Sequence, residues 1–222
     1  MSRDCKYKFC IPKLFLKDRM SQNISGIHKI FSYPLIYSLT QIIMSGVSVR
    51  SALVKKIINE NAKVLDIGCG TAKILESLPL VDYYGYDISK KYISYAKKKY
   101  KSKRNKFYCK KFNINELDNI PKIDFILLFG VIHHLEDEEL HKILPILKKV
   151  LKKGGKIITC DPIYIKKQNI ISHFLIKNDV GKNVRNKEDY LKLLRKYFRN
   201  IKFNIKHQNF IPYTWFSTQC IK

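Results

Sequence analysis

The sequence predicts an α/β fold built on a parallel, doubly wound sheet with helices on both faces. Two observations predict it. From residue 63 onward, short apolar runs rich in β-branched residues alternate with segments of helical period. Near the end of the chain, two strand-like segments follow each other with only a short link, which favours an antiparallel pair.

The length and composition fit one domain with an addition. A chain of 222 residues, 45% of them hydrophobic, can bury one substantial core. Residues 27–59 have apolar positions at helical spacing on both sides of a break at 45–50, which predicts two helices ahead of the sheet. We therefore expect an N-terminal helical lid or extension over residues 1–60 and a main domain over residues 61–222.

The first half of the main domain alternates strands with helices. Each predicted strand is a short run of β-branched or aromatic residues, and each predicted helix has a helical period. The strands are KVLDI (63–67), DYYGYDI (82–88), KFYC (106–109) and DFILLFG (124–130). The helices between them are GTAKILESL (70–78) and SKKYISYAKKKY (89–100).

The second half continues this pattern and then departs from it. We expect a helix over 137–153, stopped by the two glycines at 154–155, and a strand at KIITC (156–160). Residues 161–185 predict an irregular connection, longer than the usual loop. The last predicted elements are a helix at 186–198, capped by Asn186, and strands at 201–207 and 212–220.

A glycine turn follows the first predicted strand, in VLDIGCGTA (64–72). Gly68 and Gly70 let the backbone approach a ligand closely, and the helix start behind them presents unpaired N–H groups. A dinucleotide site needs a third glycine where this chain has Lys73, and Asp66 at the strand end would repel a pyrophosphate. The same carboxylate suits a ligand that carries an ammonium group.

A second carboxylate stands at the end of the next predicted strand. Asp87 lies seventeen residues after Gly70, and a carboxylate there can accept hydrogen bonds from two vicinal ribose hydroxyls. Together the two sites describe an adenosine-type ligand with a ribose, an amino group and no pyrophosphate. S-adenosylmethionine fits this description.

In these motifs the sequence resembles the class I S-adenosylmethionine-dependent methyltransferases, in particular the compact members that act on small molecules. VLDIGCGTA matches their first motif, YYGYDIS the acidic end of the second strand, FILLFGVIHHL the end of the fourth, and LKKGGKII the approach to the fifth. The resemblance is strong over residues 63–160. It implies a Rossmann-like fold with a seven-stranded, mostly parallel sheet and an antiparallel C-terminal hairpin.

The resemblance also implies roles for residues at the strand ends. The acid and glycines of the first motif would surround the methionine moiety, Asp87 would bind the ribose, and Ile88 would pack on the adenine. At the adenine amino group the family usually has an acid, where this chain has Asn113. The expected cofactor-binding residues are Asp66, Gly68, Cys69, Gly70, Asp87, Ile88, Asn113, Ile114, Phe129 and Gly130.

Two adjacent histidines follow the fourth predicted strand, in GVIHHLEDEELH (130–141). His133 or His134 could act as a catalytic general base or orient the acceptor; alternatively, one imidazole supports the loop through a bond to the backbone. The acids at 136–139 are expected in the first turn of a helix, where the helix dipole favours negative charge. A metal site is not favoured, because the i, i+4 histidine pair of a zinc helix is missing.

Further predictions concern the acceptor. Related enzymes place a lid over the cofactor with their N-terminal helices, which here would contribute Tyr33, Tyr37 and Gln41. Arg185 could hold an anionic acceptor, or be a solvated residue before a helix cap. DPIY (161–164) resembles the loop of amino-group methyltransferases, but it follows the fifth strand instead of the fourth. We therefore expect it to be a strand-end turn on the substrate side.

The composition limits the partners and the location. A net charge of +25 favours anionic partners, although the dispersed lysines favour a diffuse basic surface over a dedicated nucleic-acid patch. Six cysteines without a CxxC pair, and no apolar run long enough to span a bilayer, predict a cytoplasmic protein with reduced thiols. The basic, aromatic N-terminus permits peripheral membrane contact.

These observations predict methyl transfer from S-adenosylmethionine to a small molecule, a saccharide or a lipid-linked metabolite. Two alternatives stay open at this point. The charge is compatible with an RNA acceptor, and intact cofactor motifs are also compatible with a regulatory protein that binds S-adenosylmethionine without catalysis.

Overall fold

The structure, a computed structural model, describes residues 47–177, 181–208 and 212–222. The first of the two predicted N-terminal helices lies outside the described residues. The second is α2 (Val47–Ile57), and it begins inside the segment 45–50 that we expected to be a break.

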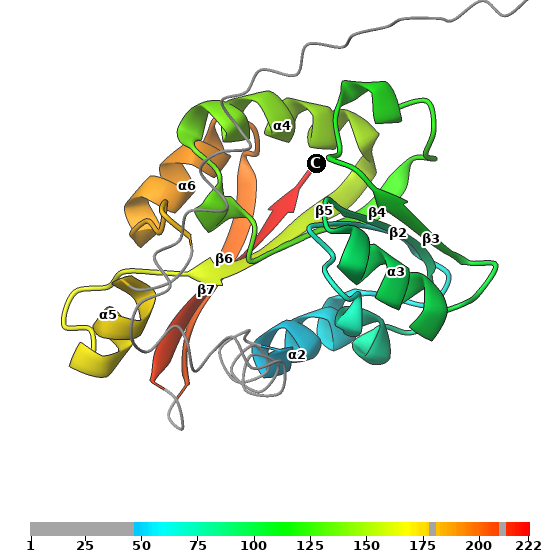
Figure 1. Cartoon of the computed structure of the whole chain (residues 1–222). Helices are drawn as coiled ribbons and strands as arrows, with labels where there is room; N and C mark the ends of the chain where they lie inside the picture. The colour runs from blue at the N-terminus through cyan, green and yellow to red at the C-terminus, as the bar shows by residue number, and fades with distance from the viewer. Residues whose placement is uncertain (1–46, 178–180, 209–211) are drawn as a thin grey trace, which may run out of the picture. The chain divides into compact units, whose positions relative to one another are not determined.

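Within the described residues, a seven-stranded sheet forms the centre of the fold (Figure 1). The sheet order is β3-β2-β1-β4-β5-β7-β6. Strands β1 to β5 pair in parallel, and β7 pairs antiparallel with both β5 and β6. This confirms the predicted fold class, including the C-terminal hairpin. The strands are β1 (Lys63–Ile67), β2 (Asp82–Asp87), β3 (Asn105–Cys109), β4 (Ile123–Phe129), β5 (Leu151–Pro162), β6 (Asn200–Gln208) and β7 (Tyr213–Ile221).

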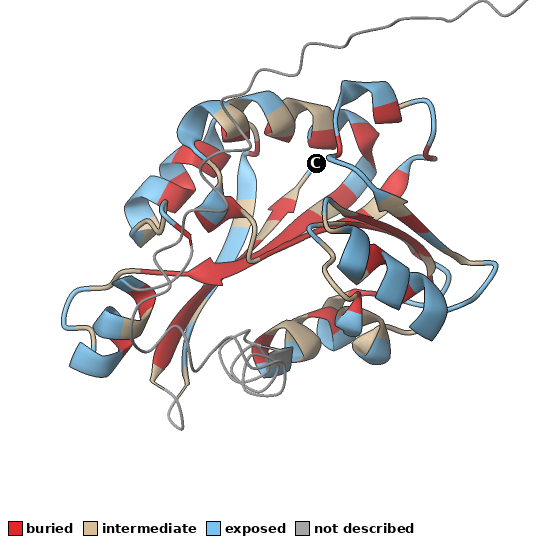
Figure 2. Ribbon diagram, in the orientation of Figure 1, coloured by how far each residue is buried: buried red, intermediate tan, exposed pale blue. Residues whose placement is uncertain are grey.

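Helices cover both faces of the sheet, and each face has its own buried cluster. On one face, Leu140, Leu144 and Leu147 of α4 recur at helical spacing and pack in a cluster that also holds leucines of α6. On the other face, side chains of α2 and α3 join Ile176 of α5. Figure 2 shows the buried residues running along the central strands between these layers. The remaining helices are α3 (Lys90–Lys99), α4 (Asp137–Val150), α5 (Ile170–Lys177) and α6 (Lys187–Arg195).

The first predicted helix of the main domain was wrong in type and length. In place of a helix over 70–78, the chain forms η2, a short 3-10 helix over Lys73–Ser77. Ala72 before it has a left-handed φ of 55°, so regular helix does not extend back into the glycine turn. On the other side Pro79 disfavours helical geometry for Leu78, which is extended.

The helix before β5 is shorter than we expected. It ends at Val150, because Leu151 is extended (ψ 141°) and already belongs to β5. The two glycines therefore lie inside β5 and do not stop the helix. The pairing of β4 with β5 shifts register between Ile123 and Phe125, and Gly154 has a φ of 76° there, so the glycines accommodate an irregularity of the strand.

The connection over residues 161–185 is more regular than we expected, because it contains helix α5. The cap predicted for the following helix is confirmed: the side chain of Asn186 accepts a hydrogen bond from the backbone of Asp189 (2.9 Å). None of the helices in the described part of the chain has both the length and the apolar character needed to cross a bilayer.

Candidate functional site

The carboxyl ends of the central parallel strands meet at one edge of the sheet. β1 lies between β2 and β4. The connection after β1 packs in the cluster with α2 and α3, whereas the connection after β4 runs through α4 on the opposite face. Connections that leave neighbouring strands toward opposite faces open a crevice between them, which is where doubly wound sheets bind ligands. The predicted site residues follow these strand ends.

Asp87 fixes the glycine turn after β1. Its Oδ2 accepts a hydrogen bond from the backbone N–H of Gly70 (2.9 Å), and its Oδ1 accepts one from Ser89 (2.8 Å). Gly68 has a φ of +72°, and a Cβ there would lie 2.8 Å from Cγ2 of Val131. The turn therefore needs glycine at this position. A carboxylate offers about four acceptor positions, so Asp87 can still accept from a ligand.

Asp66 is a buried carboxyl group at the end of β1. It is 3% exposed, and the hydroxyl of Tyr83 donates a hydrogen bond to its Oδ2 (2.6 Å). Burial raises the pKa of Asp66 from 3.8 to about 7, against the opposing effects of the Tyr83 hydrogen bond and the positive charge of Arg50. A cation bound beside it would favour the ionised form. An ammonium group bound beside it would therefore lower the pKa of Asp66.

Arg50 of α2 is a site residue that the sequence did not predict. Its guanidinium lies 5.8 Å from the ring centre of Phe129 and 5.3 Å from that of Trp215. It also lies against the backbone of Gly130, where a Cβ would be 2.8 Å from Nη2. The Nε atom of Arg50 is buried and has no hydrogen-bond partner among the described residues. A buried N–H without an acceptor fits an anionic ligand group.

The side chains predicted to hold the adenine lie in the open. Ile88, after β2, and Ile114, after β3, are 57% and 54% exposed. Two exposed aliphatic side chains at these strand ends suit a flat aromatic ring. Asn113 uses its Oδ1 to accept from the backbone of Asn115 (2.9 Å) and so caps a short 3-10 helix, η3 (Ile114–Glu116). Burial raises the pKa of the Cys69 thiol above its ordinary range, so this thiol stays neutral.

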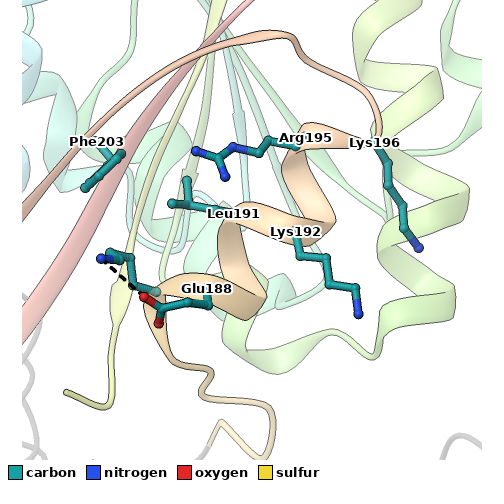
Figure 3. Close-up of a pocket in the computed structure, with 7 residues that line it drawn as sticks. Glu188, Leu191, Lys192, Arg195, Lys196 and Phe203 are labelled. Carbon is teal, nitrogen blue, oxygen red and sulfur yellow. Dashed lines mark ion pairs between the residues drawn. The ribbon is translucent and has the colours of Figure 1, made fainter. Parts of the chain in front are cut away.

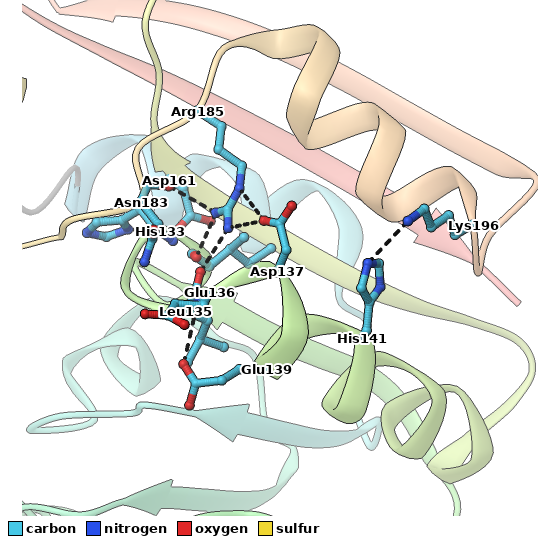
Figure 4. A network of polar contacts seen from close by, with 11 residues as sticks. His133, Leu135, Glu136, Asp137, Glu139, His141, Asp161, Asn183, Arg185 and Lys196 are labelled. Atoms are coloured by element: carbon cyan, nitrogen blue, oxygen red, sulfur yellow. Dashed lines mark hydrogen bonds and ion pairs between the residues drawn. The ribbon is translucent and has the colours of Figure 1, made fainter. Parts of the chain in front are cut away.

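His133 and Asp161 form a buried pair across the strand ends (Figure 4). Nδ1 of His133 lies 2.8 Å from Oδ1 of Asp161, and the backbone N–H of His133 donates to the same oxygen (3.2 Å). An ionised Asp161 would keep the proton on Nδ1, which leaves Nε2 as the basic atom. Oδ2 of Asp161 is buried without a partner among the described residues. Gly181 packs so closely on the imidazole that a Cβ there would collide with it.

Arg185 clamps the loop that carries His133 (Figure 4). All five of its N–H donors make hydrogen bonds to side-chain or backbone oxygens around the loop. In this arrangement an anionic methyl acceptor could bind Arg185 only if some of these hydrogen bonds broke. The acceptors are Asp137 Oδ1, from Nε and Nη2, and the backbone oxygens of Ile132, Leu135 and Asn183.

The other polar residues of this loop have structural contacts. Glu136 and Glu139 form a capping box at the start of α4, as expected for acids in a first turn. His141 points away toward α6, with Nδ1 2.8 Å from the hydroxyl of Tyr197. His134 is exposed, and its ring centre lies 4.1 Å from that of His133. Among the described residues, no group of three or more His, Cys, Asp or Glu side chains is placed to hold a metal ion.

The residues predicted on the acceptor side differ in how far the structure describes them. The proposed lid residues Tyr33, Tyr37 and Gln41 lie outside the described residues. DPIY (161–164) is not a turn: Asp161 and Pro162 are the last residues of β5 and pair with Phe216 and Trp215 of β7. Because the antiparallel β7 extends this pairing, β5 continues two residues further than we expected.

A surface pocket of about 670 Å³ lies elsewhere, between α6 and β6 (Figure 3). Four basic side chains, one acid and two apolar residues line it. None of the predicted site residues is among them, so we assign no catalytic role to this pocket. Its lining residues are Lys187, Glu188, Leu191, Lys192, Arg195, Lys196 and Phe203.

Comparison with known proteins identifies a family for most of the chain. A family model described as a methyltransferase domain matches residues 58–217. An uncharacterized protein of Rickettsia prowazekii is 36% identical over 102 residues, 43% of this chain and 41% of the relative. An uncharacterized methyltransferase of Bacillus cytotoxicus is 30% identical over 121 residues, 51% of this chain and 53% of the relative. The chain thus spans about half the length of the curated relatives it matches.

Solved structures show the same fold. An S-adenosylmethionine-dependent methyltransferase from Archaeoglobus fulgidus superposes with a TM-score of 0.63 at 16% sequence identity. The superposition covers 84% of this chain and 99% of that one. The resemblance noted in the sequence is confirmed at the level of family and fold.

The titration of Asp66 should be visible in the stability of the free protein. Between pH 4 and 7 the folded state holds this carboxyl protonated, whereas the unfolded chain has ionised it. The free energy of unfolding should therefore fall as the pH rises through this window, by on the order of 1.4 kcal/mol per pH unit. In the variant Asp66→Asn this decrease should be absent. Urea unfolding at pH 4 and at pH 7 measures the free energy of unfolding at the two ends of the window. The exposed Asp118→Asn is the control, and an unchanged slope in the Asp66 variant would contradict the assignment.

Proposed function

The chain belongs to the methyltransferase domain family, and on this premise we propose that it transfers a methyl group from S-adenosylmethionine to a hydroxyl of its acceptor. The acceptor we propose is a small molecule, a saccharide or a lipid-linked metabolite. One observation carries the proposal: the buried Asp66 carboxyl group lies close enough to Arg50 to be affected by its charge, and the guanidinium of Arg50 lies against Gly130 with a buried Nε that has no acceptor among the described residues.

This pair matches the charges of an amino-acid group. Asp66 would bind the ammonium of the methionine moiety, and Arg50, whose Nε has no acceptor among the described residues, would bind its carboxylate. Asp87 stands on the neighbouring strand, where it would accept from the ribose hydroxyls. The exposed Ile88 and Ile114 would cover the adenine. The residues present therefore fit the amino-acid group, the ribose and the adenine of the cofactor.

S-adenosylmethionine supplies a methyl group on a positively charged sulfur, which is already activated for attack. The protein's residues must then position the acceptor in line with that group and exclude water. For a hydroxyl acceptor, a base must also take the proton as the new bond to carbon forms.

His133 is the base we propose, with Asp161 as its positioning residue. The pair is buried, and the imidazole lies close to Gly130: a Cβ on that glycine would be 3.6 Å from Cε1 of His133. The imidazole therefore stands next to the methionine end of the proposed cofactor site. Its Nε2 would receive the proton of the hydroxyl, and the Asp161 carboxylate would stabilise the resulting imidazolium. The acceptor reaches Nε2 only if Gly181 moves away from the ring.

Two substitutions should separate the two ends of the cofactor. Arg50→Gln should weaken binding of S-adenosylmethionine by about tenfold or more and leave adenosine binding unchanged, because adenosine has no carboxylate. Asp87→Asn should weaken both ligands, because both contain the ribose. Isothermal titration measures the four affinities, with Glu76→Gln, in an exposed ion pair with Lys99, as the control. Equal effects of Arg50→Gln on both ligands would overturn its assignment.

Transfer of labelled methyl groups into a cell extract tests the function itself. The extract is incubated with the protein and methyl-labelled S-adenosylmethionine, and then fractionated into RNA, protein, lipid and small molecules. We expect label in the small-molecule or lipid fraction. Label in RNA would favour an RNA acceptor, and cofactor binding without transfer to any fraction would favour a non-catalytic role.

Once the acceptor is known, three variants test the base. His133→Gln should lower kcat by about 100-fold, with the affinity for S-adenosylmethionine unchanged. Asp161→Asn should also lower kcat and shift the acidic limb of the pH–rate profile, which loss of a loop support would not do. His141→Gln is the matched control, since this imidazole contacts Tyr197 instead. If His134→Gln and not His133→Gln shows the loss, the neighbouring imidazole is the base.

A further inference from the structure

Helix α5 (Ile170–Lys177) presents three of its large apolar residues to solvent. Its exposed side chains include Ile170, Ile171 and Phe174, which are 86%, 57% and 61% exposed, whereas its buried residues are Ser172 and Ile176. A helix on a soluble core normally does the reverse, with large apolar residues inside and small polar ones outside. Clustered exposed apolar side chains indicate a contact surface, and much of the ribbon of this helix has the colour of exposed residues in Figure 2.

Hydrogen bonds, one of them buried, hold the helix in this orientation. The hydroxyl of Ser172 lies 3.3 Å from that of Thr214 on β7, and Gln168 donates to the same serine (3.2 Å) and to the backbone of Ile163 (3.0 Å). Asn169 accepts from the backbone of Ile171 (2.9 Å) at the start of the helix. Turning the isoleucines inward would break these bonds inside the protein, so their outward position is a stable feature of the fold.

Basic residues flank this apolar face at both ends of the helix. Lys166 and Lys167 precede α5 and Lys177 ends it, and all three are exposed. Such a combination of isoleucine and phenylalanine with flanking lysines suits the boundary between the headgroups and acyl chains of an anionic bilayer. Nucleic acid would use the lysines but not the aliphatic side chains.

We propose that α5 docks the protein on an anionic lipid surface. Ile170, Ile171 and Phe174 enter the interface, and Lys166, Lys167 and Lys177 contact lipid phosphates. An eight-residue helix reaches only the interfacial layer, so the contact is peripheral and reversible. α5 follows the end of β5 that carries Asp161, which brings the lipid surface to the edge of the sheet where the site lies. This docking does not depend on the proposed function, since it needs neither cofactor nor acceptor.

A tryptophan at position 174 tests insertion directly. The natural Trp215 is 3% exposed and gives a constant background. With vesicles of about seven parts phosphatidylcholine to three parts phosphatidylglycerol, the emission of Phe174→Trp should shift to the blue, and brominated acyl chains should quench it. Leu80→Trp, at a side chain that is also 61% exposed, should not respond. An unresponsive Phe174→Trp, or equal responses at both positions, would overturn the proposal.

Co-sedimentation separates the apolar contact from the general positive charge. The variant Ile170→Gln/Ile171→Gln/Phe174→Gln keeps every lysine, and we expect its binding to the same vesicles to fall by about tenfold at about 0.15 M salt. The matched variant Leu80→Gln/Tyr95→Gln/Phe203→Gln changes three other exposed apolar residues and should bind as the natural protein does. Equal vesicle binding by both variants would contradict the proposal. So would a loss of self-association in the α5 variant with vesicle binding intact, which would assign the face to a second copy of the chain.

Discussion

The parallel pairing of β1 with β4 is the constraint on which the site depends. These strands are far apart in the sequence, and their pairing places Asp66 beside Leu127 in the middle of the sheet. Because β2 occupies the other side of β1, the connections from β1 and β4 pass over opposite faces. This topology brings the glycine turn, the Asp66 carboxyl group and the loop of His133 to one edge of the sheet. A carboxyl group buried there has a raised pKa, which a cationic ligand would reverse.

The loop after β4 is held from two sides. Asp161 of β5 binds the backbone and the imidazole of His133, and Arg185 binds the backbone carbonyls of Ile132 and Leu135 on either side of it. The backbone N–H of Asn183 donates to the carbonyl of His133 (2.9 Å), so the chain just before α6 also contacts this loop. The position of the imidazole therefore depends on chain segments that lie some 28 to 50 residues further on. Such fixed orientation is what a general base needs, because a small displacement of a reacting group is costly in rate.

Local patterns predicted the elements whose signals are local. The β-branched runs, the glycine turn, the acids at the start of α4 and the Asn186 cap all lie where we expected them. The helix predicted over 70–78 failed, because the left-handed φ of Ala72 and the proline at 79 were not weighed against its helical period. The register shift that accommodates Gly154 was also invisible, since it depends on the pairing of β5 with β4.

In the candidate site, too, the residues with a local sequence signal were predictable and those placed by tertiary packing were not. Asp66 and Asp87 belong to motifs within a few residues of a strand end, so the sequence indicated them. Arg50 has no such motif, and only the packing of α2 against Phe129 and Trp215 brings it to the site. The pairing of His133 with Asp161 and the clamp by Arg185 likewise follow from tertiary structure, because the partners are too distant in the sequence for any spacing rule.

The sheet order has one more consequence, for behaviour at high protein concentration. β3 and β6 form the two edges within the described residues, and edge strands offer unpaired backbone groups to other molecules. Lys106 on β3 and Lys202 and Lys206 on β6 are exposed along these edges. Strand-to-strand association of two copies would bring like charges together and desolvate them. The lysine-rich composition therefore protects both edges against aggregation, whatever partners the rest of the surface binds.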